Sequence, residues 1–168
     1  AWSLPKKSMQ PPLRSVQGLP HMRKLFEEGC IDFLGSDHAP FSNEEKASPS
    51  MPDGIAAVEA TLPILLWRVF TKEISLTRIA ELCSERPAKA FGIFPQKGQI
   101  AVGSDADLVV VDLTEHSIVD LNKVKTRAKD CMRLYEGREA GGKVVMTMVR
   151  GQIVLEKGEI VAKPGYGK

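Results

Sequence analysis

The spacing of apolar residues changes once along the chain, near Gln96. Before that point it follows a helical period, and after it apolar and polar residues alternate with the period of two that is typical of strands. The pattern therefore predicts two parts. Residues 1–95 combine helices with a buried strand, and residues 96–168 form a small β-rich body, either a sandwich or part of one.

The first part is expected to contain a strand between helices. Pro20 suits the first turn of a helix, which Gly29 ends. The apolar run that follows, residues 31–36, is expected to be a short buried strand, and residues 41–54 a long loop rich in Pro, Gly and Ser. Further helices are expected over residues 57–70, after the capping residue Ser75, and over residues 86–92.

Short strands are expected in the second part, because Val, Ile and Leu gather there between turn residues. The pattern gives no clear assignment for the charged residues 114–140. The expected strands are residues 98–100, 108–111, 143–149, 152–155 and 160–161.

Composition narrows the classes of protein. The chain has 168 residues and a net charge of +2, from 23 basic and 21 acidic residues, which offers no general argument for binding nucleic acid or a membrane surface. No apolar run reaches the roughly 20 residues of a membrane-spanning helix. Three cysteines without metal-ligand spacing and the lack of a signal-like start indicate a cytoplasmic protein with reduced thiols. A first residue other than Met fits processing or a piece of a longer chain.

The stretch from Ser36 to Pro40 is the strongest chemical signal, because Asp37 follows the expected buried strand directly. A carboxylate at such a place is costly unless it is hydrogen-bonded, paired or bound to metal. In a (β/α)8 barrel this end of a strand is the active-site face. On the residues alone, the favoured interpretation is a structural one, in which backbone amides or Arg14 satisfy the Asp37 carboxylate.

Four patches of the sequence, in this order, resemble the carboxyl-terminal part of the cyclic amidohydrolases, most closely the dihydroorotases, with hydantoinases and allantoinases as relatives. The most specific patch is Asp37-His38-Ala39-Pro40. The four patches are residues 11–14, residues 35–40 with 44–46, residues 54 and 59–63, and residues 97–100 with 103–110 and 149–151.

The resemblance implies an α/β fold, namely the last strands and helices of a (β/α)8 barrel over residues 1–95 followed by a β-sandwich portion over residues 96–168. It also implies a zinc-dependent hydrolase of a small cyclic amide, in which Asp37 touches the metal and serves as general base. Dihydroorotate and N-carbamoyl-aspartate, the pair interconverted in pyrimidine synthesis, are the expected reactants. A hydantoinase-like hydrolase of another cyclic amide and a non-catalytic interaction module are the alternatives.

The resemblance places four further residues near the substrate: Gln10, His38, Asp53 and Gly54. Gln10 stands where dihydroorotases have Asn and hydantoinases Ser, and Phe41 stands where many dihydroorotases have a histidine. Both departures leave the substrate open. A plain turn at Asp53-Gly54 and a structural role for His38 are the simpler readings of those residues.

Most of the metal ligands of the family are missing from this sequence. It contains three histidines and no His-x-His pair, and one carboxylate cannot hold zinc, which takes three or four protein ligands. The chain alone is therefore expected to be inactive. Its expected partners are an amino-terminal half that carries the remaining ligands and further copies of the same protein.

Overall fold

The computed structural model describes residues 9–10, 12, 15–50 and 53–167. The chain divides into two compact units, each assembled from separate segments. The first unit takes the described parts of Ala1–Ile31, Gly35–Ile64 and Ile118–Ala140, and the second takes Asp32–Leu34, Leu65–Ser117 and the described part of Gly141–Lys168. The domain boundary expected between residues 95 and 96 comes from the sequence pattern. The division into two compact units does not test that boundary, which stays a prediction.

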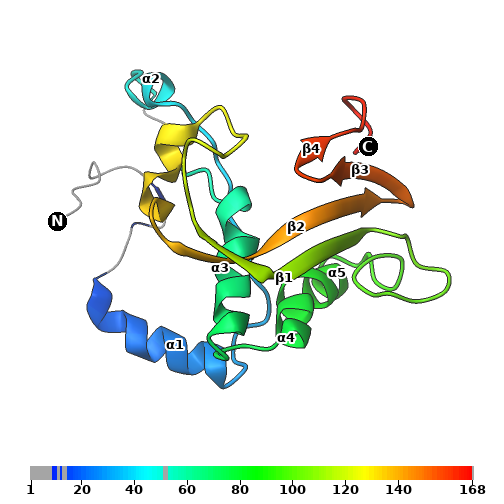
Figure 1. Cartoon of the computed structure of the whole chain (residues 1–168). Coiled ribbons are helices and arrows are strands. Elements are labelled where there is room, and N and C mark those ends of the chain that lie inside the picture. The colour runs from blue at the N-terminus through cyan, green and yellow to red at the C-terminus, as the bar shows by residue number, and fades with distance from the viewer. Residues whose placement is uncertain (1–8, 11, 13–14, 51–52, 168) are drawn as a thin grey trace. The chain divides into compact units, whose positions relative to one another are not determined.

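The first unit is mainly helical (Figure 1). Its core consists of Ala56, just before α3, and Ala60, in the first turn of α3, packed against Ala128, Cys131 and Met132. Three small residues and two sulfur-containing side chains let the backbones approach closely, and Met132 is almost fully buried. Its helical elements are η1 (Val16–Gly18), α1 (Leu19–Glu27), α2 (Asn43–Lys46), the first part of α3 (Val58–Phe70) and η3 (Lys129–Tyr135).

The second unit holds the rest of α3 and a continuous helical stretch made of α4 (Leu76–Ala80), η2 (Glu81–Glu85) and α5 (Arg86–Ala90). Ser75 caps this stretch as predicted, since its Oγ accepts a hydrogen bond from the Arg78 N–H at 3.1 Å. Leu82 and Ala88 are buried on its inner side.

A single four-stranded sheet, with its strands in chain order, lies in the second unit except for the last residue of β1 and the first two of β2 (Figure 1). The strands are β1 (Leu108–Ile118), β2 (Glu139–Val149), β3 (Gln152–Glu156) and β4 (Glu159–Ile160). β3 pairs antiparallel with both β2 and β4, and a bulge interrupts β2 between Thr147 and Met148. The predicted strands after residue 107 are confirmed in kind, although β1 and β2 run longer than expected.

An ion-pair cluster fixes the loop before β1 to the turn between β2 and β3. The Asp107 carboxylate accepts hydrogen bonds from the Arg150 N–H, at 2.7 Å, and from the Lys97 ammonium, which also lies 2.9 Å from Asp105. These interactions lower the pKa of Asp107 and raise the pKa of Lys97. Residues 98–100, predicted as a strand, form a bend without strand structure beside this cluster.

Two expectations for the first part are wrong. Residues 31–36 form no strand, and Asp32 and Phe33 are exposed where a buried strand was expected. A strand of a parallel sheet exists only through hydrogen bonds to neighbouring strands, and among the described residues no strand pairs with this segment. The Leu34 N–H instead donates to the carbonyl of Leu82, which lies in a helical segment. Residues 41–54 are not wholly a loop either: Ser42 and Glu45 form a reciprocal capping box that starts α2.

The described residues thus have the mixed helix and sheet content of an α/β protein. They form one sheet, whereas a sandwich needs two, and the barrel expected from the resemblance stays a prediction. No helix in the described part of the chain is long and apolar enough to cross a membrane.

Candidate functional site

Asp37 lies in an exposed segment with an unusual backbone. Its φ of 45° falls in the left-handed region, which Asp tolerates better than most residues because its short side chain can bond locally. Within the described residues, no hydrogen bond or ion pair reaches its carboxylate. Arg14, the partner considered from the sequence, lies outside the described residues. The carboxylate of Asp37 is thus available to solvent and to a ligand.

His38 has a defined partner, the beginning of α3. Its Nδ1 accepts hydrogen bonds from the backbone N–H groups of Ala57, at 3.0 Å, and Val58, at 3.3 Å. Because both partners are donors, Nδ1 carries no proton in this arrangement, and the neutral ring has its proton on Nε2. The two N–H groups are among those that a helix start leaves without an intrahelical partner.

Gly54 lies against the same segment. A Cβ atom at this position would stand 2.3 Å from the Cβ of Ala39 and 2.8 Å from its carbonyl oxygen, so only glycine fits. The Ala39 N–H donates to the carbonyl of Ile55 at 2.9 Å, and His38 and Ile55 form an isolated parallel bridge. The ammonium of Lys46 donates to the Gly54 carbonyl. Three of the predicted site residues, Asp37, His38 and Gly54, are therefore brought together.

The other two predicted site residues, Asp53 and Gln10, differ in how far they are buried. One carboxylate oxygen of Asp53, Oδ1, is buried without a hydrogen-bond partner in the described structure. Such an atom is costly to bury, which sets Asp53 apart from an ordinary turn residue. Gln10 is exposed, and no interaction within the described residues joins it to the other four.

Two residues that were given no role of their own in the predicted site, although Glu59 belongs to one of the sequence patches, support this corner. Glu59, in the first turn of α3, accepts hydrogen bonds from the backbone N–H groups of Lys125, at 2.8 Å, and Thr126, at 2.6 Å. The Cys131 thiol donates to the carbonyl of Phe41, and burial raises its pKa, which keeps it protonated and able to donate. Their partners lie 66 and 90 residues away, so no local pattern could indicate them.

Comparison with known proteins places the chain in a family. The model of the amidohydrolase family matches residues 8–154, which is most of the chain. The chain belongs to the amidohydrolase family. This agrees, at the level of the family, with the resemblance seen in the sequence patches.

Similar proteins within the amidohydrolases include an L-hydantoinase of Paenarthrobacter aurescens, 39% identical over 98% of this chain and 37% of its own length. A D-phenylhydantoinase of Escherichia coli is 32% identical over 95% of this chain and 36% of its own length. A solved D-hydantoinase (dihydropyrimidinase) from Thermus sp. matches with a TM-score of 0.83 and 32% identity, covering 96% of this chain and 36% of that one. The chain spans about a third of the length of the curated relatives it matches.

Amidohydrolases are generally metal-dependent, and a metal site in this chain would need several ligating side chains close together. The described residues contain no group of three or more His, Cys, Asp or Glu side chains placed to hold a metal ion. Asp37 alone does not meet the three or four protein ligands that zinc requires. The residues described in this chain therefore do not form the zinc centre that the sequence patches imply.

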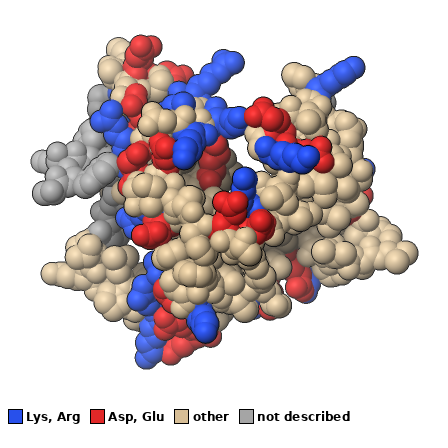
Figure 2. Space-filling model, in the orientation of Figure 1, with Lys and Arg blue, Asp and Glu red and all other residues tan. Residues whose placement is uncertain are grey.

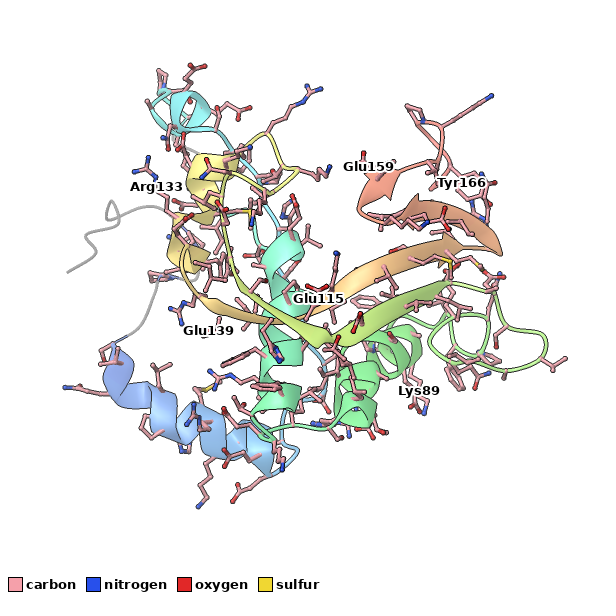
Figure 3. The ribbon with its side chains drawn as sticks, viewed as in Figure 1. Lys89, Glu115, Arg133, Glu139, Glu159 and Tyr166 are labelled. Carbon is pink, nitrogen blue, oxygen red and sulfur yellow. The ribbon has the colours of Figure 1, made fainter. Side chains whose placement is uncertain are left out.

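A separate cavity of about 440 Å³ lies in the second unit, between the sheet and the carboxyl-terminal segment. Tyr166 lines it beside β3 and β4 (Figure 3), and its hydroxyl donates to the Val149 carbonyl at 3.2 Å. Arg150 donates to the Tyr166 carbonyl at 2.6 Å and lies over its ring. The lining is mainly apolar and includes none of the five predicted site residues.

Among the described residues on the face shown in Figure 2, charge does not mark a binding surface. Figure 2 shows acidic and basic side chains intermixed on the face it presents, with neutral areas between them. This agrees with the nearly balanced count of 23 basic and 21 acidic residues and gives no sign of a site for a polyanion.

Proposed function

We propose that this chain forms part of a hydantoinase-like enzyme that hydrolyses a small cyclic amide, and that Asp37 is its proton-carrying carboxylate. The observation that carries the proposal is the 39% identity to an L-hydantoinase, which extends over 98% of the chain. The sequence patches favoured dihydroorotase over hydantoinase. The similar proteins reported above are named hydantoinases, so the comparisons favour the alternative reading instead.

The local structure supports a chemical role for Asp37. A general base needs a carboxylate that can reach the attacking water, and the Asp37 carboxylate is exposed and has no partner within the described residues. We propose that it accepts a proton from the water that attacks the ring carbonyl and returns it to the ring nitrogen as the amide bond breaks. Gln10, Asp53 and Gly54 remain the proposed substrate contacts. His38, which the resemblance also placed near the substrate, is bound through Nδ1 to the start of α3.

The remaining features of the proposal concern the whole protein. Zinc would need ligands from outside the residues described here, with Asp37 as the one ligand proposed from this chain. Association with an amino-terminal half, assembly of several copies and a cytoplasmic location also stay proposals.

The proposal is tested by assaying the complete gene product on hydantoins, dihydropyrimidines and dihydroorotate. We expect hydrolysis of hydantoins or dihydropyrimidines, and a loss of at least about 100-fold in kcat for the Asp37→Asn variant, which keeps the size of the side chain but removes its basicity. Preference for dihydroorotate would restore the first interpretation. Unchanged activity in Asp37→Asn would remove Asp37 from the mechanism.

A further inference from the structure

His38 is placed to control the residue before it in the sequence. Its Nδ1 receives the N–H groups of Ala57 and Val58, which lie 19 and 20 positions further along the chain. Helix starts are usually capped by a nearby Ser, Thr, Asp or Asn, whose side chain bonds the following N–H groups. Here a distant histidine does this, so the contact joins two segments of the first unit rather than closing a local turn.

Further contacts hold the backbone of this segment on the carboxyl-terminal side of Asp37. The Ala39 N–H donates to the Ile55 carbonyl at 2.9 Å, and Gly54 allows its close approach to Ala39. Asp37 itself has a left-handed backbone and, within the described residues, no partner for its side chain. The ring of His38 therefore holds the chain by a side-chain contact immediately after Asp37, whose own carboxylate has no partner within the described residues.

We infer that His38 is a positioning residue, which fixes Asp37 by tying its own backbone to the start of α3 through Nδ1. The inference rests on the proposed function, in which Asp37 handles the proton. It assigns His38 a role different from substrate contact. A substrate contact by this ring would use Nε2–H, the one ring group that the contacts with α3 leave able to donate.

The two roles use different atoms of the ring, so two amide substitutions separate them. Asn places its Oδ1 close to where Nδ1 of histidine stands and keeps an acceptor for Ala57 and Val58. Gln places its amide further out, near the position of Nε2, and keeps a donor there. If His38 positions Asp37, His38→Asn should retain activity. If His38 contacts the substrate, His38→Gln should retain activity instead.

The kinetic experiment compares His38→Asn, His38→Gln and His38→Ala in the complete protein, assayed on a hydantoin. We expect kcat of His38→Asn within about threefold of the parent, and kcat of the Gln and Ala variants about 10- to 100-fold lower with little change in KM, as for a misplaced catalytic group. The inference is overturned if His38→Gln is the active variant, if His38→Asn is as impaired as His38→Ala, or if His38→Ala retains full kcat.

A second readout does not depend on activity. Hydrogen exchange measured by mass spectrometry on peptides covering residues 53–60 should show faster exchange in the Gln and Ala variants and parent-like exchange in His38→Asn. Unchanged exchange in His38→Ala would show that His38 does not anchor this segment to α3. If the parent protein hydrolyses no cyclic amide, the proposed function fails, while the exchange pattern still decides whether His38 anchors this segment to α3.

Discussion

The backbone of Asp37 gives the first test at the scale of single residues. A left-handed conformation costs an ordinary L-residue about 1–2 kcal/mol, and Gly avoids that cost but is more flexible in the unfolded chain by about 0.5–1 kcal/mol. With φ of 45° at Asp37, Asp37→Gly should keep or raise the free energy of unfolding by up to about 1 kcal/mol, while Asp37→Ala should lower it by about 1 kcal/mol. Urea unfolding measures both.

The comparison with Asn is the matched control, since Asn tolerates the left-handed region as Asp does. Asp37→Asn should leave the stability unchanged while removing activity. If Asp37→Ala proved as stable as Asp37→Gly, the left-handed backbone at this position would be refuted. The combination of a stable protein and lost activity is the behaviour expected of a residue kept for chemistry rather than for folding.

Gly54 gives the second test at this scale. A Cβ atom there would overlap the Cβ and carbonyl oxygen of Ala39 and would force φ of 145° on an alanine. Overpacking and backbone strain each cost about 1–3 kcal/mol, so Gly54→Ala should lower the free energy of unfolding by at least about 2 kcal/mol. Gly35→Ala, where nothing lies within 4 Å of the added atom, is the control and should change stability by less than about 0.5 kcal/mol. Equal effects would contradict the close packing of Gly54 on Ala39.

At the scale of elements, local signals predicted some structures well. The helix over α3, the Ser75 cap and the strands after residue 107 follow from patterns within a few residues, and the structure confirms them. The strand expected over residues 31–36 fails because an apolar run indicates burial but does not supply a neighbouring strand. The site divides in the same way: Asp37 stands out in the sequence, whereas the contacts of His38 and Glu59 join distant positions and leave no local trace.

The ion-pair cluster that joins the loop before β1 to the turn after β2 should stabilise the fold to an extent that depends on pH. Its acceptor is Asp107, whose pKa the Lys97 ammonium and the Arg150 N–H hold below the ordinary value of 3.8. A carboxyl with a lowered pKa in the folded state adds stability that is fully present above pH 3.8 and is lost as the pH falls through the lower, folded value. Asp107→Asn should therefore be less stable than the parent at pH 7, by about 1 kcal/mol for this partly exposed pair.

The difference between parent and Asp107→Asn should shrink as the pH falls below about 4, because the parent then protonates the same group. Thermal unfolding at pH 7, 5 and 3 measures it. Lys97→Met is the companion variant: it removes the ammonium but leaves the Arg150 N–H bonded to Asp107, so part of the pH dependence should remain. A difference that stays constant with pH would show that the Asp107 carboxylate is not the titrating group.

At the scale of the whole molecule, the predicted chemistry and the ligands present do not match. The carboxylate proposed for proton transfer lies in this chain, but the described residues gather no set of three metal ligands around it or elsewhere. The chain also spans about a third of the length of the relatives it matches. We therefore expect the capacity to hold zinc to belong to the complete protein and not to these 168 residues alone.

Metal analysis of two samples tests this expectation. After dialysis against metal-free buffer, the 168-residue chain, checked for folding by circular dichroism, should retain far less than one zinc per molecule, because a single carboxylate is too weak a ligand set. The complete protein should retain about one or two ions, as a full set of ligands would. Asp37→Asn should lower that content in the complete protein and change nothing in the chain alone. A full equivalent of zinc in the isolated chain that disappears in Asp37→Asn would show instead that this chain assembles a metal centre by itself.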